Sequence, residues 1–175
     1  MIAFTIGHST RAIGDFVALL VAHSVDRLID VRTVPRSRHN PQFNQDVLPA
    51  ALDTAGIRYA HAASLGGFRH THPGSVNAGW RNLSFRGYAD YMQTPEFAHA
   101  LAELLDQARG ARIALMCAEA VPWRCHRSLI ADALTVNGVP TQEIASASRL
   151  QLHVLTSFAR VDGTTITYPA AEAHH

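Results

Sequence analysis

One stretch of the sequence, residues 112–133, contains the two patterns from which a parallel β-sheet is built. Residues 113–116 form a short apolar run with the length and boundaries of a buried strand. After a Pro-Trp turn, apolar residues recur at the spacing of one helical face, and they are Leu129, Ile130, Ala133 and Leu134. A strand followed closely by an amphipathic helix predicts the repeating unit of an α/β protein.

The turn between this strand and this helix is crowded with side chains that carry chemistry. They are Cys117, Glu119, Arg124, Cys125, His126 and Arg127. The three basic ones lie at or before the first helical turn, where unsatisfied N–H groups already carry partial positive charge. Cations are disfavoured there, so we expect a compensating partner, which is either an internal carboxylate or a bound anion.

Composition limits the classes to which the chain can belong. A length of 175 residues, with 47% hydrophobic and 17% charged residues, is typical of one globular domain. The net charge of +1 makes nucleic acid, and duplex DNA above all, a weak prospect as a partner. Two cysteines form no disulfide framework, and neither a secretory signal nor a membrane-length apolar run is present. We expect a cytoplasmic protein without a membrane partner.

Strand and helix patterns alternate along the chain, which predicts a single-domain, Rossmann-like α/β fold over residues 1–169. The sheet is expected to be parallel, with helices on both faces, and a C-terminal β-hairpin turns at Asp162-Gly163. Residues 152–155 are expected to be extended, and residues 170–175 to form a disordered tail. Asn44 is a predicted helix cap, with Pro49 limiting that helix, and Thr94 caps a helix that starts at Pro95.

Polar side chains follow the first four predicted strands, at the carboxyl ends where ligands bind in open parallel sheets. They are His8, Ser9 and Thr10, then Asp30 and Arg32, then Tyr59 and His61, and finally Cys117 and Glu119. We expect these residues to gather in one cleft. The long irregular stretches 33–44 and 64–84 are typical of binding loops or lids.

Five motifs resemble those of the bacterial domain-of-unknown-function family 488. They are T-I-G-H-S-T at residues 5–10, I-D-V-R-x-x-P-x-S at 29–37, L-G-G at 65–67, F-R-G-Y-A-D-Y-M at 85–92 and M-C-A-E-x(5)-C-H-R at 116–127. The resemblance spans nearly the whole chain. It implies a cytoplasmic α/β protein and supports the location of the site, but it supplies no reaction.

The two cysteines allow several interpretations. Cys125 lies beside His126 and Arg127 at a helix start, where a thiol is readily ionised to a nucleophile. Cys117 is either a second reactive group or a small buried hydrophobe at a strand end, and six residues rather than five separate it from Arg124, unlike a tyrosine-phosphatase loop. A reversible disulfide between the two remains open. A zinc site completed by His8 or His61 is disfavoured, because Cys125 and His126 should diverge on a helix, and no metal is predicted.

Anion binding is the interpretation that the sequence favours. Its candidate residues are Ser9, Asp30, Arg32, Arg36, Arg124, His126 and Arg127, with Arg38 nearby. The alternative is internal pairing, in which Asp30 and Glu119 neutralise arginines of this group. His8 and Glu119 are the general acid/base candidates, although His8 is equally interpreted as a histidine hydrogen-bonded to a loop carbonyl. Trp80, Trp123 and Tyr88 are candidates for stacking on a ring.

We therefore predict an enzyme, a hydrolase or transferase, that acts on a small phosphorylated or nucleotide-like substrate. His8, Glu119, Cys117 and Cys125 are its candidate catalytic residues. One alternative is a non-catalytic module that binds a nucleotide or a nucleic-acid end through the Arg-rich loop 35–38. Another is a thiol redox or metal-binding protein. No cofactor is predicted, and the sequence does not indicate an oligomeric state.

Overall fold

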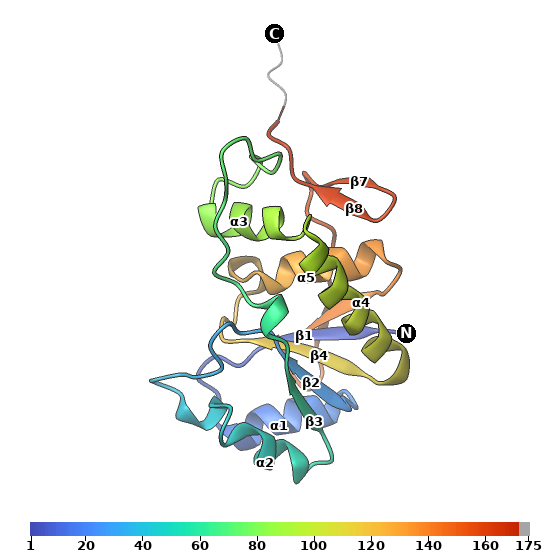
Figure 1. Cartoon of the computed structure of the whole chain (residues 1–175). Coiled ribbons are helices and arrows are strands. Elements are labelled where there is room, and N and C mark those ends of the chain that lie inside the picture. The colour runs from blue at the N-terminus through green and yellow to red at the C-terminus, as the bar shows by residue number, and fades with distance from the viewer. Residues whose placement is uncertain (172–175) are drawn as a thin grey trace.

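A six-stranded sheet with the order β3-β2-β4-β1-β5-β6 forms the centre of the structure, a computed structural model that describes residues 1–171 (Figure 1). Its strands are β1 (Ala3–Gly7), β2 (Arg27–Asp30), β3 (Arg58–His61), β4 (Ile113–Cys117), β5 (Thr141–Ile144) and β6 (Leu150–Leu152). The first five strands pair in parallel, as predicted. The last, β6, pairs antiparallel to β5, so the extended segment lies earlier than the predicted 152–155.

Helices cover both faces of the sheet, which confirms the predicted layers (Figure 1). One face carries α1 (Ile13–Ala22) and α2 (Leu48–Asp53), and the other carries α3 (Leu83–Tyr91), α4 (Pro95–Gly110) and α5 (Arg127–Val136). Alternate residues of β4 point to opposite faces, so Ala114 and Met116 pack towards α1 and α2 while Leu115 and Cys117 pack towards the other helices. The fully buried β4 explains the continuous apolar run in the sequence.

Of two helix caps predicted from the sequence, one is confirmed and one is wrong. Thr94 caps α4 by accepting a hydrogen bond from the backbone N of Phe97, as expected. The predicted cap at Asn44 is wrong: α2 starts four residues later, with Pro49 in its first turn. The side chain of Asn44 instead accepts a 2.6 Å hydrogen bond from the backbone N of Ser37 and shapes the loop.

Two buried carboxylates on helices form hydrogen bonds that hold the irregular segments in place. Asp90 on α3 accepts hydrogen bonds from Thr71, Ser75 and Asn77 of the long loop. Asp132 on α5 accepts from His153, Thr156 and Tyr168 of the C-terminal segment, which carries the predicted hairpin. The hairpin strands are β7 (Arg160–Asp162) and β8 (Thr165–Thr167). Short 3₁₀ helices lie at Pro41–Phe43, Ala63–Leu65 and Pro122–Arg124.

Part of the predicted tail, residues 172–175, lies outside the described residues. Within residues 1–171, no helix is both long enough and apolar enough to cross a membrane.

Candidate functional site

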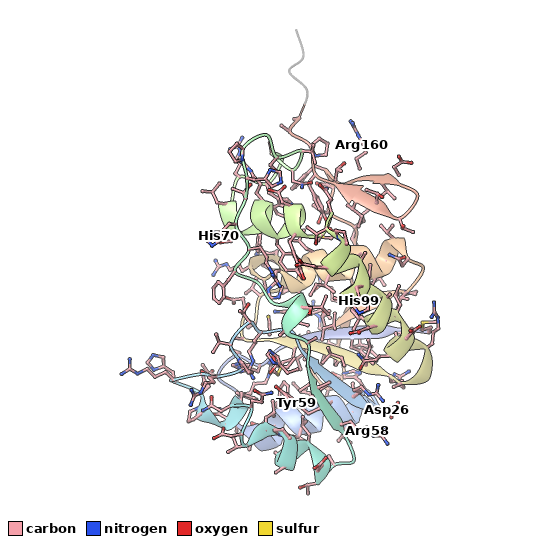
Figure 2. All side chains as sticks on the ribbon, viewed as in Figure 1. Asp26, Arg58, Tyr59, His70, His99 and Arg160 are labelled. Atoms are coloured by element: carbon pink, nitrogen blue, oxygen red, sulfur yellow. The ribbon has the colours of Figure 1, made fainter. Side chains whose placement is uncertain are left out.

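A cavity of about 340 Å³ lies at the carboxyl ends of β2 and β4. Its lining comes from the residues after these two strands, the loop before α3, α3 itself and the turn before α5. The lining residues are Arg32, Thr33, Val34, Arg36, Gly67, Phe68, Ser84, Phe85, Tyr88, Cys117, Ala118, Glu119, Arg124, Cys125 and His126. A larger cavity of about 410 Å³ between α4 and the hairpin has no ionisable side chain in its lining. A cavity of about 350 Å³ has Arg127, Glu143 and His153 in its lining, but each of these is in an internal ion pair, so the first cavity is the better candidate. Figure 2 shows Asp26 and Arg58 at the opposite, amino-terminal ends of the strands, and His99 on the outer face of α4.

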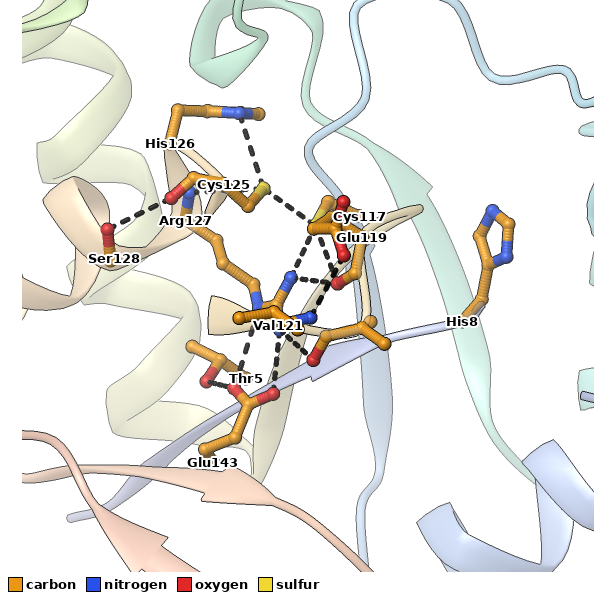
Figure 3. Close-up of polar contacts among 12 residues, drawn as sticks. Thr5, His8, Cys117, Glu119, Val121, Cys125, His126, Arg127, Ser128 and Glu143 are labelled. Carbon is orange, nitrogen blue, oxygen red and sulfur yellow. Dashed lines mark hydrogen bonds and ion pairs between the residues drawn. The ribbon is translucent and has the colours of Figure 1, made fainter. Parts of the chain in front are cut away.

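Cys125 places its sulfur at the start of α5 (Figure 3). The backbone of Cys125 is extended, with φ −131° and ψ 143°, and the helix begins only at Arg127. The sulfur accepts a 3.5 Å contact from the backbone N of Arg127 and lies 3.6 Å from Nδ1 of His126. The expectation that Cys125 and His126 diverge is therefore wrong, because Cys125 precedes the helix.

His126 is oriented by a backbone carbonyl. Its Nε2 lies 3.0 Å from the carbonyl oxygen of Val31, and since that oxygen only accepts, Nε2 carries the proton. Nδ1 is then free to take a proton from Cys125, the arrangement of a nucleophile, a base and an orienting group. Gly67 packs against the ring, where a Cβ would lie 3.3 Å from Nδ1.

The two cysteine sulfurs are 2.7 Å apart and both are free thiols (Figure 3). The hydrogen bond between the two sulfurs lowers the pKa of Cys125 to about 4 although burial acts to raise it, and His126 and Arg127 lower it further. Burial raises the pKa of Cys117, and the neighbouring Cys125 raises it further. The two shifts run in opposite directions, so Cys125 loses its proton before Cys117.

Arg127 is fully buried and faces an internal carboxylate rather than the cavity. Its Nη2 lies 2.7 Å from Oε1 of Glu143, and its Nη1 lies 2.6 Å from the sulfur of Cys117. The carbonyl oxygens of Glu119 and Ala120 also accept from it. Internal pairing is thus confirmed for Arg127, but the predicted partner was wrong: β5 supplies the carboxylate.

The loop after β4 has no phosphate-binding geometry. Its carbonyl oxygens at Glu119 and Ala120 point inward to Arg127, where a phosphate loop would present N–H groups. The side chain of Glu119 is exposed at the cavity and accepts a 3.2 Å hydrogen bond from the backbone N of Val121. Cys117 therefore does not occupy the nucleophile position of a phosphatase loop.

Arg32 is also held internally. Asp30 binds it in a bidentate manner, with Oδ1 2.9 Å from Nε and Oδ2 2.8 Å from Nη2. The carbonyl oxygen of Phe43 accepts a further bond from Arg32, and Tyr59 donates to Asp30 at 2.6 Å. The predicted Asp30–Arg32 pairing is confirmed, and it leaves only a small part of the Arg32 side chain in contact with the cavity.

His8 does not line the cavity, and Figure 3 shows it apart from the sulfur pair. Its Nδ1 donates to the carbonyl oxygen of Ser9 at 2.8 Å, and its ring stacks on Phe43 at 4.2 Å. Burial lowers the pKa of His8, so the ring is neutral at pH 7. The structure thus gives His8 the geometry of the predicted alternative, a histidine hydrogen-bonded to its own loop, and Ser9 lies with it, away from the cavity lining.

Arg36 and Arg124 are the exposed cations of the cavity lining. Neither forms an ion pair with any residue in the described part of the chain. Phe68, which is 83% exposed, and the buried Tyr88 supply an apolar wall beside them. The other two stacking candidates lie elsewhere: Trp80 packs on Phe85, Phe158 and Tyr168, and Trp123 lines a different cavity.

Residues 1–171 contain no cluster of three or more His, Cys, Asp or Glu side chains arranged to hold a metal ion. His61, which could have completed the disfavoured zinc site, lies with its Nε2 2.7 Å from the carbonyl oxygen of Arg32. The functional feature that sequence reasoning missed is Glu143. Its only signal was a carboxylate within the short predicted strand 141–145.

Comparison with known proteins gives one family. No curated protein and no solved structure matches the chain significantly. The family described as "Domain of unknown function DUF488" matches residues 12–134, which include β2, β3, β4, both cysteines and every residue of the cavity lining. The match covers more than half of the chain, and the protein belongs to the DUF488 family.

Proposed function

We propose that the protein is an enzyme in which the thiolate of Cys125 attacks a small anionic substrate bound in the cavity. One observation carries the proposal: the sulfur of Cys125 lines the cavity at the start of α5, in contact with His126 and Cys117. A thiolate in such surroundings is the form that reacts as a nucleophile.

Arg36 and Arg124 would bind the anionic group of the substrate. They are exposed and line the cavity, whereas Arg32 and Arg127 already have carboxylate partners. A guanidinium matches phosphate and carboxylate groups equally well in geometry, so the substrate class is a small phosphorylated or carboxylated molecule. Phe68 and Tyr88 would contact an apolar or ring portion, as in a nucleotide.

His126 would move the proton in a reaction of two steps. In the first, the thiolate of Cys125 forms a bond to the electrophilic atom of the substrate. The bond to the leaving group breaks, and the leaving group takes the proton that Cys125 has passed to Nδ1 of His126. In the second step, water attacks the same atom, its proton passes to His126, and Cys125 departs as the thiolate. The exposed Glu119 can orient that water.

Alkylating agents of different charge test the proposal. Iodoacetate carries a carboxylate, whereas iodoacetamide is neutral and of similar size. We expect Cys125 to react preferentially with iodoacetate, and the double variant R36Q/R124Q to lower that preference by about thirtyfold, since each of the two contacts contributes about 1 kcal/mol in water. Arg160 is exposed on the hairpin, far from the cavity (Figure 2), so R160Q is the matched control. Equal preference in the double variant and in R160Q would refute anion binding at this site.

A non-catalytic module that binds a nucleotide or a nucleic-acid end is the second candidate, favoured by the exposed Arg36 and Arg38 on one loop. Its ligand binding would weaken steeply with salt and would persist in C125S. A ligand whose turnover is lost in C125S supports the enzyme.

The two free thiols also fit a reducing compartment, and we include a cytoplasmic location in the proposal.

A further inference from the structure

We infer that Cys117 and Cys125 form a dithiol that a hydroperoxide converts to a disulfide, with Cys125 oxidised first and Cys117 resolving the product. This activity shares with the proposed function the need for a reactive Cys125. It is otherwise independent of anion binding.

The two sulfurs come from different elements and meet at the cavity. Cys117 ends β4 and Cys125 precedes α5, with the exposed turn containing the 3₁₀ helix Pro122–Arg124 between them. Their sulfurs are 2.7 Å apart, and both residues line the cavity, through which a small oxidant can arrive. The segment between the cysteines is exposed at residues 118–120 and again at Trp123 and Arg124 of its 3₁₀ helix, so bond formation requires only local adjustment.

The surroundings assign different roles to the two cysteines. Cys125 receives contacts from the backbone N of Arg127 and from His126, and its lowered pKa gives a thiolate at neutral pH. Cys117 retains its proton because burial and the adjacent anion raise its pKa. A thiolate that lines a cavity beside a second cysteine is the arrangement in which peroxide oxidation ends as a disulfide.

The chemistry balances with a hydroperoxide as the oxidant. The thiolate of Cys125 attacks the terminal oxygen of the hydroperoxide, an S–O bond forms as the O–O bond breaks, and the alkoxide or hydroxide leaves and takes a proton from water, giving the sulfenic acid. Cys117 then attacks the sulfur of Cys125, an S–S bond forms, and the hydroxyl leaves with the proton of Cys117 as water. Two thiols thus give two electrons to the peroxide, and an external dithiol restores them by two exchange steps.

Arg127 assists the second step. Its Nη1 lies 2.6 Å from the sulfur of Cys117, where a cation favours the thiolate. While Cys125 is ionised, the negative charge next to Cys117 opposes this effect. Oxidation of Cys125 to a neutral sulfenic acid removes that charge, so Cys117 ionises more readily once there is a sulfenic acid to attack.

Mass spectrometry of the reduced protein after a brief exposure to stoichiometric hydrogen peroxide tests the inference. Wild type should lose two hydrogens and both alkylatable thiols. C117S should instead gain one oxygen as a sulfenic acid that dimedone traps at residue 125, and C125S should stay reduced under the same exposure. Circular dichroism checks that the variants fold, and the wild-type result needs no variant.

Three results would overturn the inference: wild type that becomes a sulfinic acid without a disulfide, C125S oxidised as fast as wild type, or C117S without a trappable sulfenic acid. The proposed function fails separately. Loss of the preference for iodoacetate with intact disulfide formation removes only anion binding, and a preference for iodoacetate without a disulfide removes only this inference.

Discussion

Replacement of Glu143 by Gln would remove the negative charge beneath the sulfur pair while nearly preserving the side-chain volume. Glu143 accepts from Arg127 at 2.7 Å and 3.4 Å and also from Thr5. Arg127 is fully buried and Glu143 is only 8% exposed, so the pair is shielded from bulk solvent. The variant leaves a buried guanidinium with only neutral oxygen acceptors, those of residues 119, 120 and 143, besides the Cys117 sulfur.

The expected loss of unfolding free energy depends on which acceptors remain for the buried guanidinium of Arg127. Removal of one partner from a buried ion pair costs about 3–5 kcal/mol. The carbonyl groups of Glu119 and Ala120 remain, and the new amide oxygen can still accept, so we expect E143Q to lower the free energy of unfolding by ~3 kcal/mol. A loss of this size is a large fraction of the ~5–15 kcal/mol that stabilises a typical domain.

Urea unfolding followed by circular dichroism at pH 7 measures this effect. D106N is the matched control, because Asp106 pairs with Arg109 on the exposed surface, where both side chains are more than 60% exposed. The control should change the free energy by less than ~1 kcal/mol. If E143Q does not fold, T5V removes only one hydrogen bond to Glu143 and should cost ~1 kcal/mol. A loss in E143Q no larger than in D106N would show that Arg127 is not buried as described.

Three further predictions concern groups that act by hydrogen bonds. C117A removes the bond that most lowers the pKa of Cys125, so the midpoint of its alkylation rate should rise from about 4 towards the ordinary thiol value of ~8.5; an unchanged pH–rate profile would contradict this role. D132N weakens the acceptor that holds His153, Thr156 and Tyr168, and hydrogen exchange should show faster opening of residues 150–169 than of the sheet. Burial alone would raise the pKa of Asp90, but hydrogen bonds from Ser75, Asn77 and Thr71 lower it overall. Its stabilisation is therefore present above the unfolded value of ~3.9 and lost as the pH falls through the folded value, so unfolding curves of D90N and wild type should differ at pH 7 and converge in acid.

The fold was predictable because its signals are local. The buried β4 reads as an apolar run, and the Thr94-Pro95 start of α4 is set by capping chemistry within one turn. The helix cap predicted at Asn44 was wrong because its side chain has a competing partner in the loop. That partner is the backbone N of Ser37, which comes near only in the folded chain. The edge strand β6 carries no pattern of its own, since all three of its residues are exposed.

The site was predictable in its position but not in its pairing. The rule that ligands bind at the carboxyl ends of strands leads to Cys117 and to the residues after β2. The same rule led to His8, but stacking on Phe43 and the bond to Ser9 hold that ring away from the cavity lining. Which carboxylate neutralises Arg127 depends on β5 lying next to β1, a long-range contact that no local pattern encodes.

The misplaced cations at the start of α5 are explained from within the protein. Arg127, at the first helical position, directs its guanidinium to Glu143 on the sheet, and the backbone N of the same residue faces the thiolate of Cys125. The helix dipole that disfavours a cation there stabilises a sulfur anion by the same partial charges. An internal carboxylate and a thiolate therefore both compensate the helix start, and no external anion is needed for Arg127. Arg36 and Arg124 have no ion-pair partner among the described residues, so they, unlike Arg127, remain available to the anionic substrate that we propose.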